Sequence, residues 1–342
     1  MIVSKFGGTS VGSADNIEKV IEIAKQKKEQ VAVVVSALGG VTNQLIRASE
    51  LSLEADPAYE NILDELDTRH RETIDALLQG DFKESALQHL KETLDELRMI
   101  LQGVSLLSDL SGKSAARIVS TGEILSSYLI TMAMKQRGLK AALKDSRQLI
   151  RTDDTFQKAL VDYDVTYSNI AEFFASTEAE IIVLPGFIAS NEKGETTTLG
   201  RGGSDFTAAL IANGAHADCL EIWTDVSGMY TANPKLVRQA KPIESISYQE
   251  AMELSHFGAK VLYPPTVQPA LDKGIDILIK NTMEPEAPGT RITEKTKLNR
   301  YLIKGISHIE YIALLTLEGN GMVGVPGISS RLFGALADEL IN

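Results

Sequence analysis

The sequence predicts an α/β fold with a mostly parallel central sheet and helices on both faces. Apolar segments of strand composition alternate along the chain with segments whose apolar residues recur at helical spacing, an order typical of parallel sheets. The run VAVVVSAL at 31–38 is continuously apolar and β-branched, as expected for a strand buried on both faces. At three places a glycine-rich turn joins a strand to the helix that follows it.

The composition excludes several classes of protein. Of 342 residues, 44% are hydrophobic and 23% are charged, which is typical of a globular protein with two domains, or with one large domain and an appendage. The net charge of −12 argues against a nucleic-acid surface, and no apolar run approaches the roughly 20 residues that span a bilayer. One cysteine and no basic leader favour a cytoplasmic protein, and the histidines lack metal-ligand spacing.

The first strand carries Lys5 near its end and runs directly into a glycine turn. Gly7 and Gly8 allow the backbone to turn tightly and a bulky anion to approach its amides. Ser13 or Asp15 can cap the helix that follows. This junction aims backbone amides and the positive end of a helix dipole at one point beside the lysine, which favours an anion site. A tight turn with an incidental lysine is the alternative.

The later segments continue the alternation of strands and helices. Residues 56–102 are charged and helical in pattern, with leucines such as Leu63, Leu66, Leu77 and Leu78 facing inward, and we interpret their charges as a solvated face. The remaining elements are a turn with a long buried helix (116–138), a strand (140–145), a strand-rich segment (180–190), a glycine turn with a helix (195–214), a strand (217–230), two helices (247–255 and 266–273) and a strand (275–281).

The pattern changes after the last of these strands. EPEAPGT at 284–290 is rich in proline and glycine and predicts a domain boundary. Beyond it, residues 311–319 alternate like a strand and residues 328–341 form an amphipathic helix. One strand and one helix cannot bury a core of their own, so we interpret this tail as the front half of a second domain.

Candidate binding residues lie in the third glycine turn and just after the strands. In TLGRGGSDFTAAL, the rigid fork of Arg201 suits a carboxylate or a phosphate, and the flanking glycines leave room for one. Ser204 and Asp205 follow at the start of a helix, where either can also be a simple cap. Further polar residues follow the carboxyl ends of later elements, where open α/β sheets bind ligands: Thr224, Asp225, Tyr230, Lys235 and Lys260.

Six motifs occur in order over residues 2–292: KFGGTS, SALGGVTN, STGE, LGRGGSDFTA, TDVSGMYTANP and ELSHFGAKVLYP. Together they resemble aspartokinase, the aspartate-specific branch of the amino-acid kinase family. The ending LTLEGNGMVGVPGISSRLFGALA is similar to the start of its regulatory ACT region, in the form found in enzymes fused to homoserine dehydrogenase. The resemblance implies an amino-acid kinase domain at 1–292, a linker at 293–300 and a partial ACT-like α+β domain at 301–342.

The resemblance also implies roles for the matching residues. Lys5 and Asp205 match the catalytic residues, with Asp205 orienting the lysine. The phosphate loop is Gly7, Gly8, Thr9 and Ser10. The amino-acid substrate is bound by Ser36, Thr42, Glu123 (facing its ammonium), Arg201 (on its α-carboxylate) and Ser204. The nucleotide side is Thr224, Asp225, Tyr230, Lys235 and Lys260. The sequence departs from the family at two places. The family usually has Asp-Pro-Arg where this chain has Asn233-Pro234-Lys235, and it usually has histidine where this chain has Tyr263. Lysine keeps the charge but loses the fork.

The implied activity is ATP-dependent phosphorylation of the side-chain carboxylate of L-aspartate to 4-phospho-L-aspartate, the first step of lysine, threonine and methionine biosynthesis. The carboxylate nucleophile, with a pKa of about 3.9, is already ionised at pH 7, so the reaction needs no general base. Mg²⁺ is expected on the ATP phosphates and on water. We expect a homo-oligomer formed through the C-terminal region, and a homoserine dehydrogenase fused to the full-length protein is compatible with the resemblance. The alternatives are a sister kinase for glutamate or N-acetylglutamate, a non-catalytic ligand sensor, and a domain with ordinary capped turns.

Overall fold

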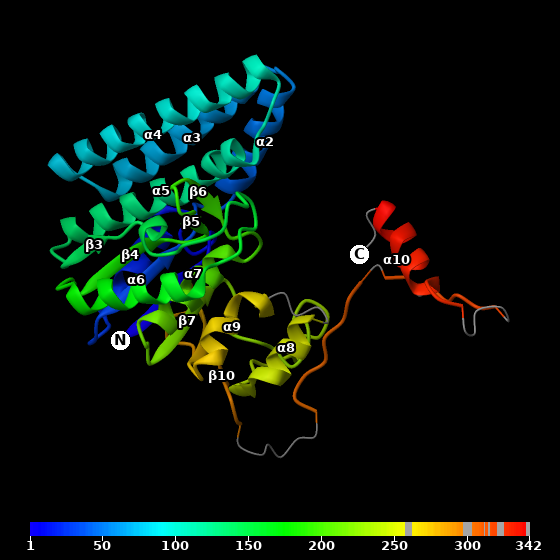
Figure 1. The fold of residues 1–342 in the computed structure, drawn as a ribbon. Coiled ribbons are helices and arrows are strands. Elements are labelled where there is room, and N and C mark those ends of the chain that lie inside the picture. The colour runs from blue at the N-terminus through cyan, green and yellow to red at the C-terminus, as the bar shows by residue number, and fades with distance from the viewer. Residues whose placement is uncertain (257–261, 297–302, 311, 314, 320–324, 340–342) are drawn as a thin grey trace. The chain divides into compact units, whose positions relative to one another are not determined.

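The computed structural model describes residues 1–342 except 257–261, 297–302, 311, 314, 320–324 and 340–342 (Figure 1). The chain forms two compact units, Met1–His308 and Ile309–Asn342. No described helix is long and apolar enough to cross a membrane.

The first unit is organised around one large sheet. Its strands are β1 (Ile2–Phe6), β2 (Val31–Val35), β3 (Ala141–Leu143), β4 (Ile181–Pro185), β7 (Cys219–Thr224), β8 (Ser245–Ser247), β9 (Asp276–Asn281) and β10 (Thr290–Thr293). Among the described residues the order is β3-β4-β2-β1-β7-β9-β10-β8, and neighbours run parallel except β9 and β10. A separate antiparallel pair joins β5 (Ile188–Ser190) to β6 (Thr196–Thr198). The prediction of a mostly parallel sheet is confirmed.

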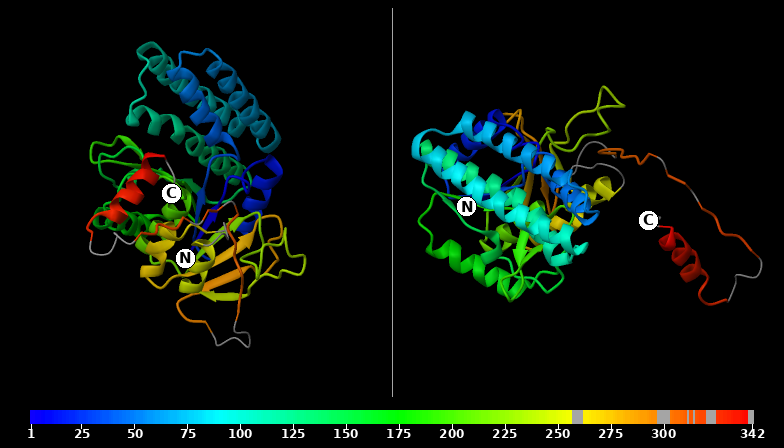
Figure 2. Two further views of the ribbon diagram at one scale, coloured as in Figure 1. Left: turned by 90° about the vertical axis from the view of Figure 1, so that its right-hand side faces the viewer. Right: turned by 90° about the horizontal axis from the view of Figure 1, so that it is seen from above.

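Helices cover both faces of this sheet (Figures 1 and 2). On one side lie α1 (Ala14–Lys25), α2 (Val41–Leu53) and α5 (Gly112–Gln136), with α3 (Tyr59–Leu77) and α4 (Gly80–Leu107) outside them. The other side packs against α6 (Tyr163–Ser176), α7 (Gly203–Gly214), α8 (Tyr248–His256) and α9 (Pro264–Asp272). A short 3₁₀ helix, η1, spans Ser146–Gln148. Helices on two faces leave the carboxyl ends of the parallel strands as the open edge of the fold.

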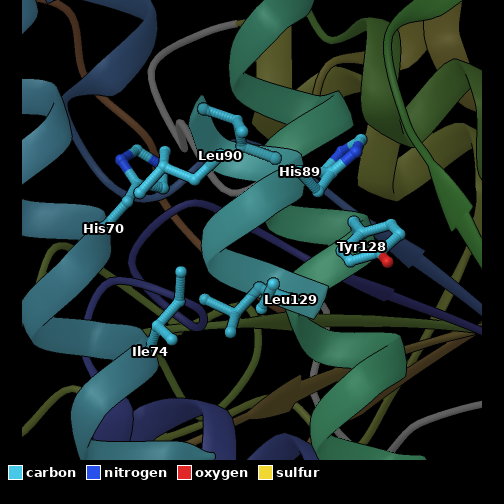
Figure 3. A pocket seen from close by; sticks show the side chains of 8 residues that line it. His70, Ile74, His89, Leu90, Tyr128 and Leu129 are labelled. Carbon is cyan, nitrogen blue, oxygen red and sulfur yellow. The ribbon is translucent and has the colours of Figure 1, made fainter. Parts of the chain in front are cut away.

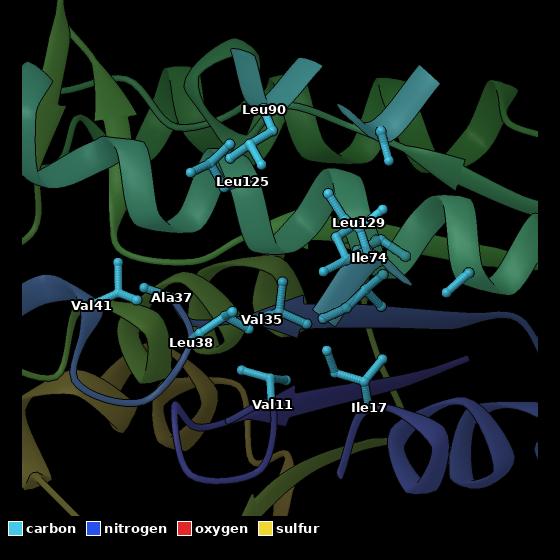
Figure 4. Packing of buried hydrophobic residues seen from close by; sticks show 14 of the residues in the cluster. Val11, Ile17, Val35, Ala37, Leu38, Val41, Ile74, Leu90, Leu125 and Leu129 are labelled. Carbon is cyan, nitrogen blue, oxygen red and sulfur yellow. The ribbon is translucent and has the colours of Figure 1, made fainter. Parts of the chain in front are cut away.

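β2 shows why a continuous apolar run predicts a central strand. Val31, Val33 and Val35 belong to the core on the α1–α5 side, whereas Ala32 and Val34 belong to the core on the α6–α9 side. Figure 4 shows Val35 among the buried side chains of the first core. Burying one such valine stabilises the fold by about 1.5–3 kcal/mol, so both faces of this strand contribute.

The charged segment predicted to be helical forms α3 and α4, which run side by side as an outer layer (Figure 1). The leucines expected to face inward, Leu63, Leu66, Leu77 and Leu78, are all buried. α4 packs on α5 and α3 packs on α2, so this layer rests on the helices that cover the sheet.

A small cavity lies between α3, α4 and α5, and two histidines line it (Figure 3). His70 is 1% exposed, its Nδ1 donates to the Leu66 carbonyl at 2.7 Å, and its Nε2 has no partner in the described part of the chain. His89 stacks on Tyr128 with ring centroids 3.9 Å apart. Burial lowers the pKa of both imidazoles, because a buried positive charge loses its hydration.

The proline- and glycine-rich segment 284–290 connects β9 to β10 within one sheet. The first compact unit also continues to His308, beyond the position where the sequence suggests a boundary. The division into a catalytic domain at 1–292, a linker at 293–300 and a partial ACT-like domain at 301–342 stays a prediction.

In the second unit, the helix predicted at 328–341 is present as α10 (Ile328–Asp338). None of its residues is buried, and Phe333 is exposed. The strand predicted at 311–319 is not formed in its described residues, 312–313 and 315–319. The physical reason is that a strand depends on a hydrogen-bonded neighbour, and these residues have none within the described chain. The ACT-like assignment of this region stays a prediction.

Candidate active site

The candidate site is built at the edge where the parallel strands end. β2, β1 and β7 are adjacent, with Val35 paired to Phe6 and Phe6 paired to Trp223. The turns after these strands therefore begin side by side, although β1 ends at Phe6, β2 at Val35 and β7 only at Thr224. This arrangement explains how separate motifs can form one site.

The turn after β1 has the features of a phosphate loop. The Gly7 amide donates to the Trp223 carbonyl at 3.3 Å, and the buried Ser10 hydroxyl lies 2.7 Å from the Thr282 hydroxyl. These contacts fix both ends of the turn, while the amides of Gly8 and Thr9 donate to no residue in the described structure. Such amides are available to an anion.

α1 follows this turn and is capped by Ser13. The Ser13 hydroxyl accepts from the Asn16 amide at 3.3 Å, which decides between the two candidate caps. The Asn16 side chain in turn donates to the Thr9 carbonyl at 2.9 Å, so the helix start and the turn hold each other.

Lys5 and Asp205 form an ion pair across the fold. Lys5 Nζ lies 2.7 Å from Asp205 Oδ1, and the two side chains are 13% and 15% exposed. The ammonium also lies close to Gly7, since a Cβ built on that glycine would be 3.6 Å from Nζ. Asp205 therefore holds the lysine head beside the turn with the free amides.

The third glycine turn leads into α7 without a side-chain cap. Its N-cap residue is Gly202, so neither Ser204 nor Asp205 serves as the cap that the sequence left open for them. Instead, the Ser36 hydroxyl donates to the Ser204 hydroxyl at 3.0 Å. The second and third glycine turns are thus joined directly.

Glu123 is a buried acid inside α5. It is 3% exposed, and its Oε2 has no partner among the described residues. Burial raises its pKa to about 8, although the amides of Ala37 and of Glu123 itself donate to it and oppose the rise. The neighbouring Gly122 allows this close packing, because a Cβ there would lie 2.6 Å from the Ala37 Cβ. A cation entering beside Glu123 would stabilise its ionised form.

The other predicted substrate residues are Thr42 and Arg201. Thr42 is half-buried in the first turn of α2. Arg201 is exposed, and its guanidinium lies 5.4 Å from the centre of the Tyr263 ring, in a cation–π arrangement. Lys158 has a left-handed backbone (φ 56°) and packs against Gly200, at the start of the third glycine turn.

The predicted nucleotide residues are only partly gathered at the strand ends. Thr224 ends β7, and its hydroxyl donates to Asp225 Oδ1 at 3.2 Å. Tyr230 pairs its backbone with Pro242 in the following loop, and Lys235 is an exposed residue of that loop. Lys260 lies outside the described residues.

Two residues that position the glycine turns had no recognisable sequence signal. The Trp223 carbonyl accepts from Gly7, and the Trp223 ring stacks on Phe6 with centroids 5.8 Å apart. Arg69, from the charged helix α3, donates to the carbonyls of Gly39 and Gly12. The sequence pattern around Trp223 indicates only a strand, and Arg69 is one of many charged residues in a helical segment.

Comparison with known proteins places this geometry in a family. The family model described as the amino acid kinase family matches residues 1–281. Lysine-sensitive aspartokinase 3 of Escherichia coli is 34% identical over 349 residues, covering 100% of this chain and 75% of the relative. Bifunctional aspartokinase/homoserine dehydrogenase 2 of Arabidopsis thaliana is 34% identical over 347 residues, and this chain spans 38% of its length.

Solved structures agree with these sequence matches. E. coli aspartokinase III in complex with aspartate and ADP has a TM-score of 0.83 and 32% identity, covering 100% of this chain and 75% of that one. The same enzyme with lysine and aspartate has a TM-score of 0.84, covering 99% of this chain and 74% of that one. The chain therefore belongs to the amino acid kinase family and, within it, to the aspartokinases.

Proposed function

We propose that this chain transfers the γ-phosphoryl group of ATP to the side-chain carboxylate of L-aspartate, giving 4-phospho-L-aspartate and ADP. The observation that carries the proposal is the Lys5–Asp205 pair, held beside the free amides of the first glycine turn. The similar E. coli aspartokinase III was solved with aspartate and ADP, which supports the same pair of ligands here.

In this proposal the nucleotide phosphates lie against the first turn. The amides of Gly8 and Thr9 and the Lys5 ammonium neutralise charge on the phosphoryl group as it moves. Thr224, Asp225, Tyr230, Lys235 and Lys260 are assigned to the rest of the nucleotide. Mg²⁺ arriving with ATP would supply further charge neutralisation beside this turn.

Asp205 acts as a positioning group in this mechanism. The attacking carboxylate of aspartate is ionised at pH 7, with a reference pKa of about 3.9, so no proton has to be removed from it. Catalysis then consists of alignment and charge neutralisation. The ion pair at 2.7 Å is suited to that role, because it fixes the lysine head without protonation chemistry.

The amino-acid end is assigned to the second and third turns. The Glu123 carboxylate, whose Oε2 has no partner among the described residues, receives the substrate ammonium, and Arg201 receives the α-carboxylate. The linked hydroxyls of Ser36 and Ser204 border the reacting carboxylate. A buried carboxylate with one unsatisfied oxygen favours a free ammonium over an N-acylated amine, which carries no charge. This observation argues against N-acetylglutamate as the acceptor.

The proposal is tested by offering aspartate, glutamate and N-acetylglutamate side by side with Mg-ATP, and by coupling ADP release to a visible signal. We expect ADP release with aspartate only, together with an acyl phosphate that hydroxylamine traps as a hydroxamate. Activity with glutamate or N-acetylglutamate that exceeds activity with aspartate would assign the chain to a sister kinase. Nucleotide binding without turnover of any acceptor would support the ligand-sensor alternative.

A further inference from the structure

The first and second glycine turns touch each other through their backbones. A Cβ built on Gly8 would lie 3.1 Å from the Ala37 carbonyl oxygen, and one built on Gly39 would lie 3.1 Å from the Gly8 carbonyl oxygen. No side chain fits between the turns at this point. Their relative position is therefore set by the backbone and by whatever holds it from outside.

Arg69 holds both turns from outside. From α3, its Nη1 donates to the Gly39 carbonyl at 2.7 Å and its Nη2 donates to the Gly12 carbonyl at 3.1 Å. One planar guanidinium thus bridges the residue Gly12, just after the phosphate loop, and the second glycine turn, which we call the substrate turn. Both bonds join the charged guanidinium to backbone carbonyls, so they are charge-assisted.

Each of these carbonyls comes directly before a helix start. The peptide after Gly12 carries the amide of Ser13, the N-cap of α1, and the peptide after Gly39 carries the amide of Gly40, the N-cap of α2. In a planar trans peptide the N–H points opposite to the C=O. Because both carbonyls are turned toward the guanidinium, both amides are turned away from it, and neither donates to a residue in the described structure.

We propose that Arg69 is a positioning residue that sets the distance and orientation between the phosphate loop and the substrate turn. This inference rests on the proposed function, in which the first turn holds the phosphoryl donor and the second borders the acceptor. Arg69 acts on both substrates through the turns and touches neither. In such alignment-dependent reactions, a shift of about 1 Å costs about 100-fold in rate.

Lysine cannot replace this contact fully, because an ammonium is a point donor whereas the guanidinium presents two parallel N–H groups in a fixed fork. We expect Arg69→Ala to lower kcat about 100-fold and to weaken ADP binding and raise KM for aspartate together, each by about tenfold. Arg69→Lys should fall between the wild type and Arg69→Ala. Millimolar guanidinium ion should restore part of the kcat of Arg69→Ala.

The matched control is Arg71→Ala on the same helix. Arg71 is exposed and pairs with Asp67 at 2.6 Å, so its removal tests a loss of charge from α3 without a loss of contact to the turns. It should leave all three kinetic constants within twofold of the wild type. Thermal unfolding of each variant shows whether a kinetic loss reflects a loss of folded protein, and Arg69→Lys serves if Arg69→Ala does not fold.

The inference is wrong if Arg69→Ala keeps normal kcat and ADP affinity, if only one substrate is affected, or if Arg71→Ala loses as much. It is also wrong if the loss follows the fraction of unfolded protein and guanidinium restores nothing. ADP titration separates this result from failure of the proposed function. If the wild type phosphorylates no acceptor, the proposed function fails, and a weakening of ADP binding confined to the Arg69 variants still supports the role of Arg69.

Discussion

The burial of Glu123 leads to a prediction of how aspartate binding depends on pH. Burial raises the pKa of this carboxyl to about 8, so at pH 7 the free protein holds it protonated in about nine molecules of ten. The substrate ammonium pairs only with the ionised form. Binding at pH 7 therefore carries the free-energy cost of ionising Glu123, about 1.4 kcal/mol, or about tenfold in apparent affinity.

The expected result is a KM for aspartate that falls as the pH rises. Between pH 6 and pH 8 the ionised fraction of a group with a pKa of about 8 rises about 50-fold, and KM should fall by the same factor before levelling off above pH 8.5. KM for ATP should change little, because Glu123 lies in the amino-acid half of the proposed site.

The assay is a set of aspartate saturation curves at half-unit steps of pH, at saturating Mg-ATP, for the wild type and Glu123→Gln. The glutamine has the shape of the protonated acid but cannot ionise, so its KM should be high at every pH and nearly flat. A wild-type KM that does not depend on pH, or a Gln variant with the same slope, would refute the pairing of Glu123 with the ammonium.

Four further predictions follow from the same geometry. Lys5→Ala should lower kcat at least about 100-fold while aspartate still binds, because Lys5 acts on charge that develops during transfer; a near-normal kcat would make the first turn purely structural. Arg201→Lys should raise KM for aspartate with little change in ADP affinity measured by titration, since lysine keeps the charge but loses the fork; a large loss of ADP affinity would contradict the assignment of the two halves. His70, whose pKa is lowered by burial, should destabilise the fold below its unfolded pKa of about 6.5, because the unfolded state then binds the proton more tightly. When the pH is lowered from 7.5 to 5.5, the melting temperature of His70→Leu should therefore fall less than that of the wild type. Equal falls would count against this explanation. The chain should self-associate through the exposed apolar face of α10, and Phe333→Asp on that face should lower the sedimentation coefficient; an unchanged coefficient would count against this contact.

Local chemistry was enough to predict much of the fold. The apolar run at 31–38 specifies a strand buried on both faces, and Ser13 specifies a helix start, because each effect depends on residues within one or two turns of chain. The glycine turns were recognisable for the same reason, and the order of strands and helices predicted a mostly parallel sheet.

Only the tertiary structure decided what the polar residues do. From its local sequence Asp205 could be a simple helix cap, and only the family resemblance implied that it orients Lys5. Its pairing with Lys5, 200 positions earlier, follows from the adjacency of β1 and β7 and from the packing of α7. The environment of Glu123 likewise depends on how α5 packs against the turn at Ala37. Neither the Lys5–Asp205 distance nor the burial of Glu123 can be predicted from a few neighbouring residues in the sequence.

Arg69 shows the same limit most clearly. In sequence it is one of many charges on a helix, and the interpretation of that segment as a solvated face is right for most of them. The sequence by itself determined which segments form helices, strands and glycine turns, because those choices depend on neighbours within a few residues. The tertiary structure decided that one guanidinium of α3 meets the carbonyls of two turns, because a contact between segments 30 and 57 residues apart depends on how the whole layer of helices packs on the sheet.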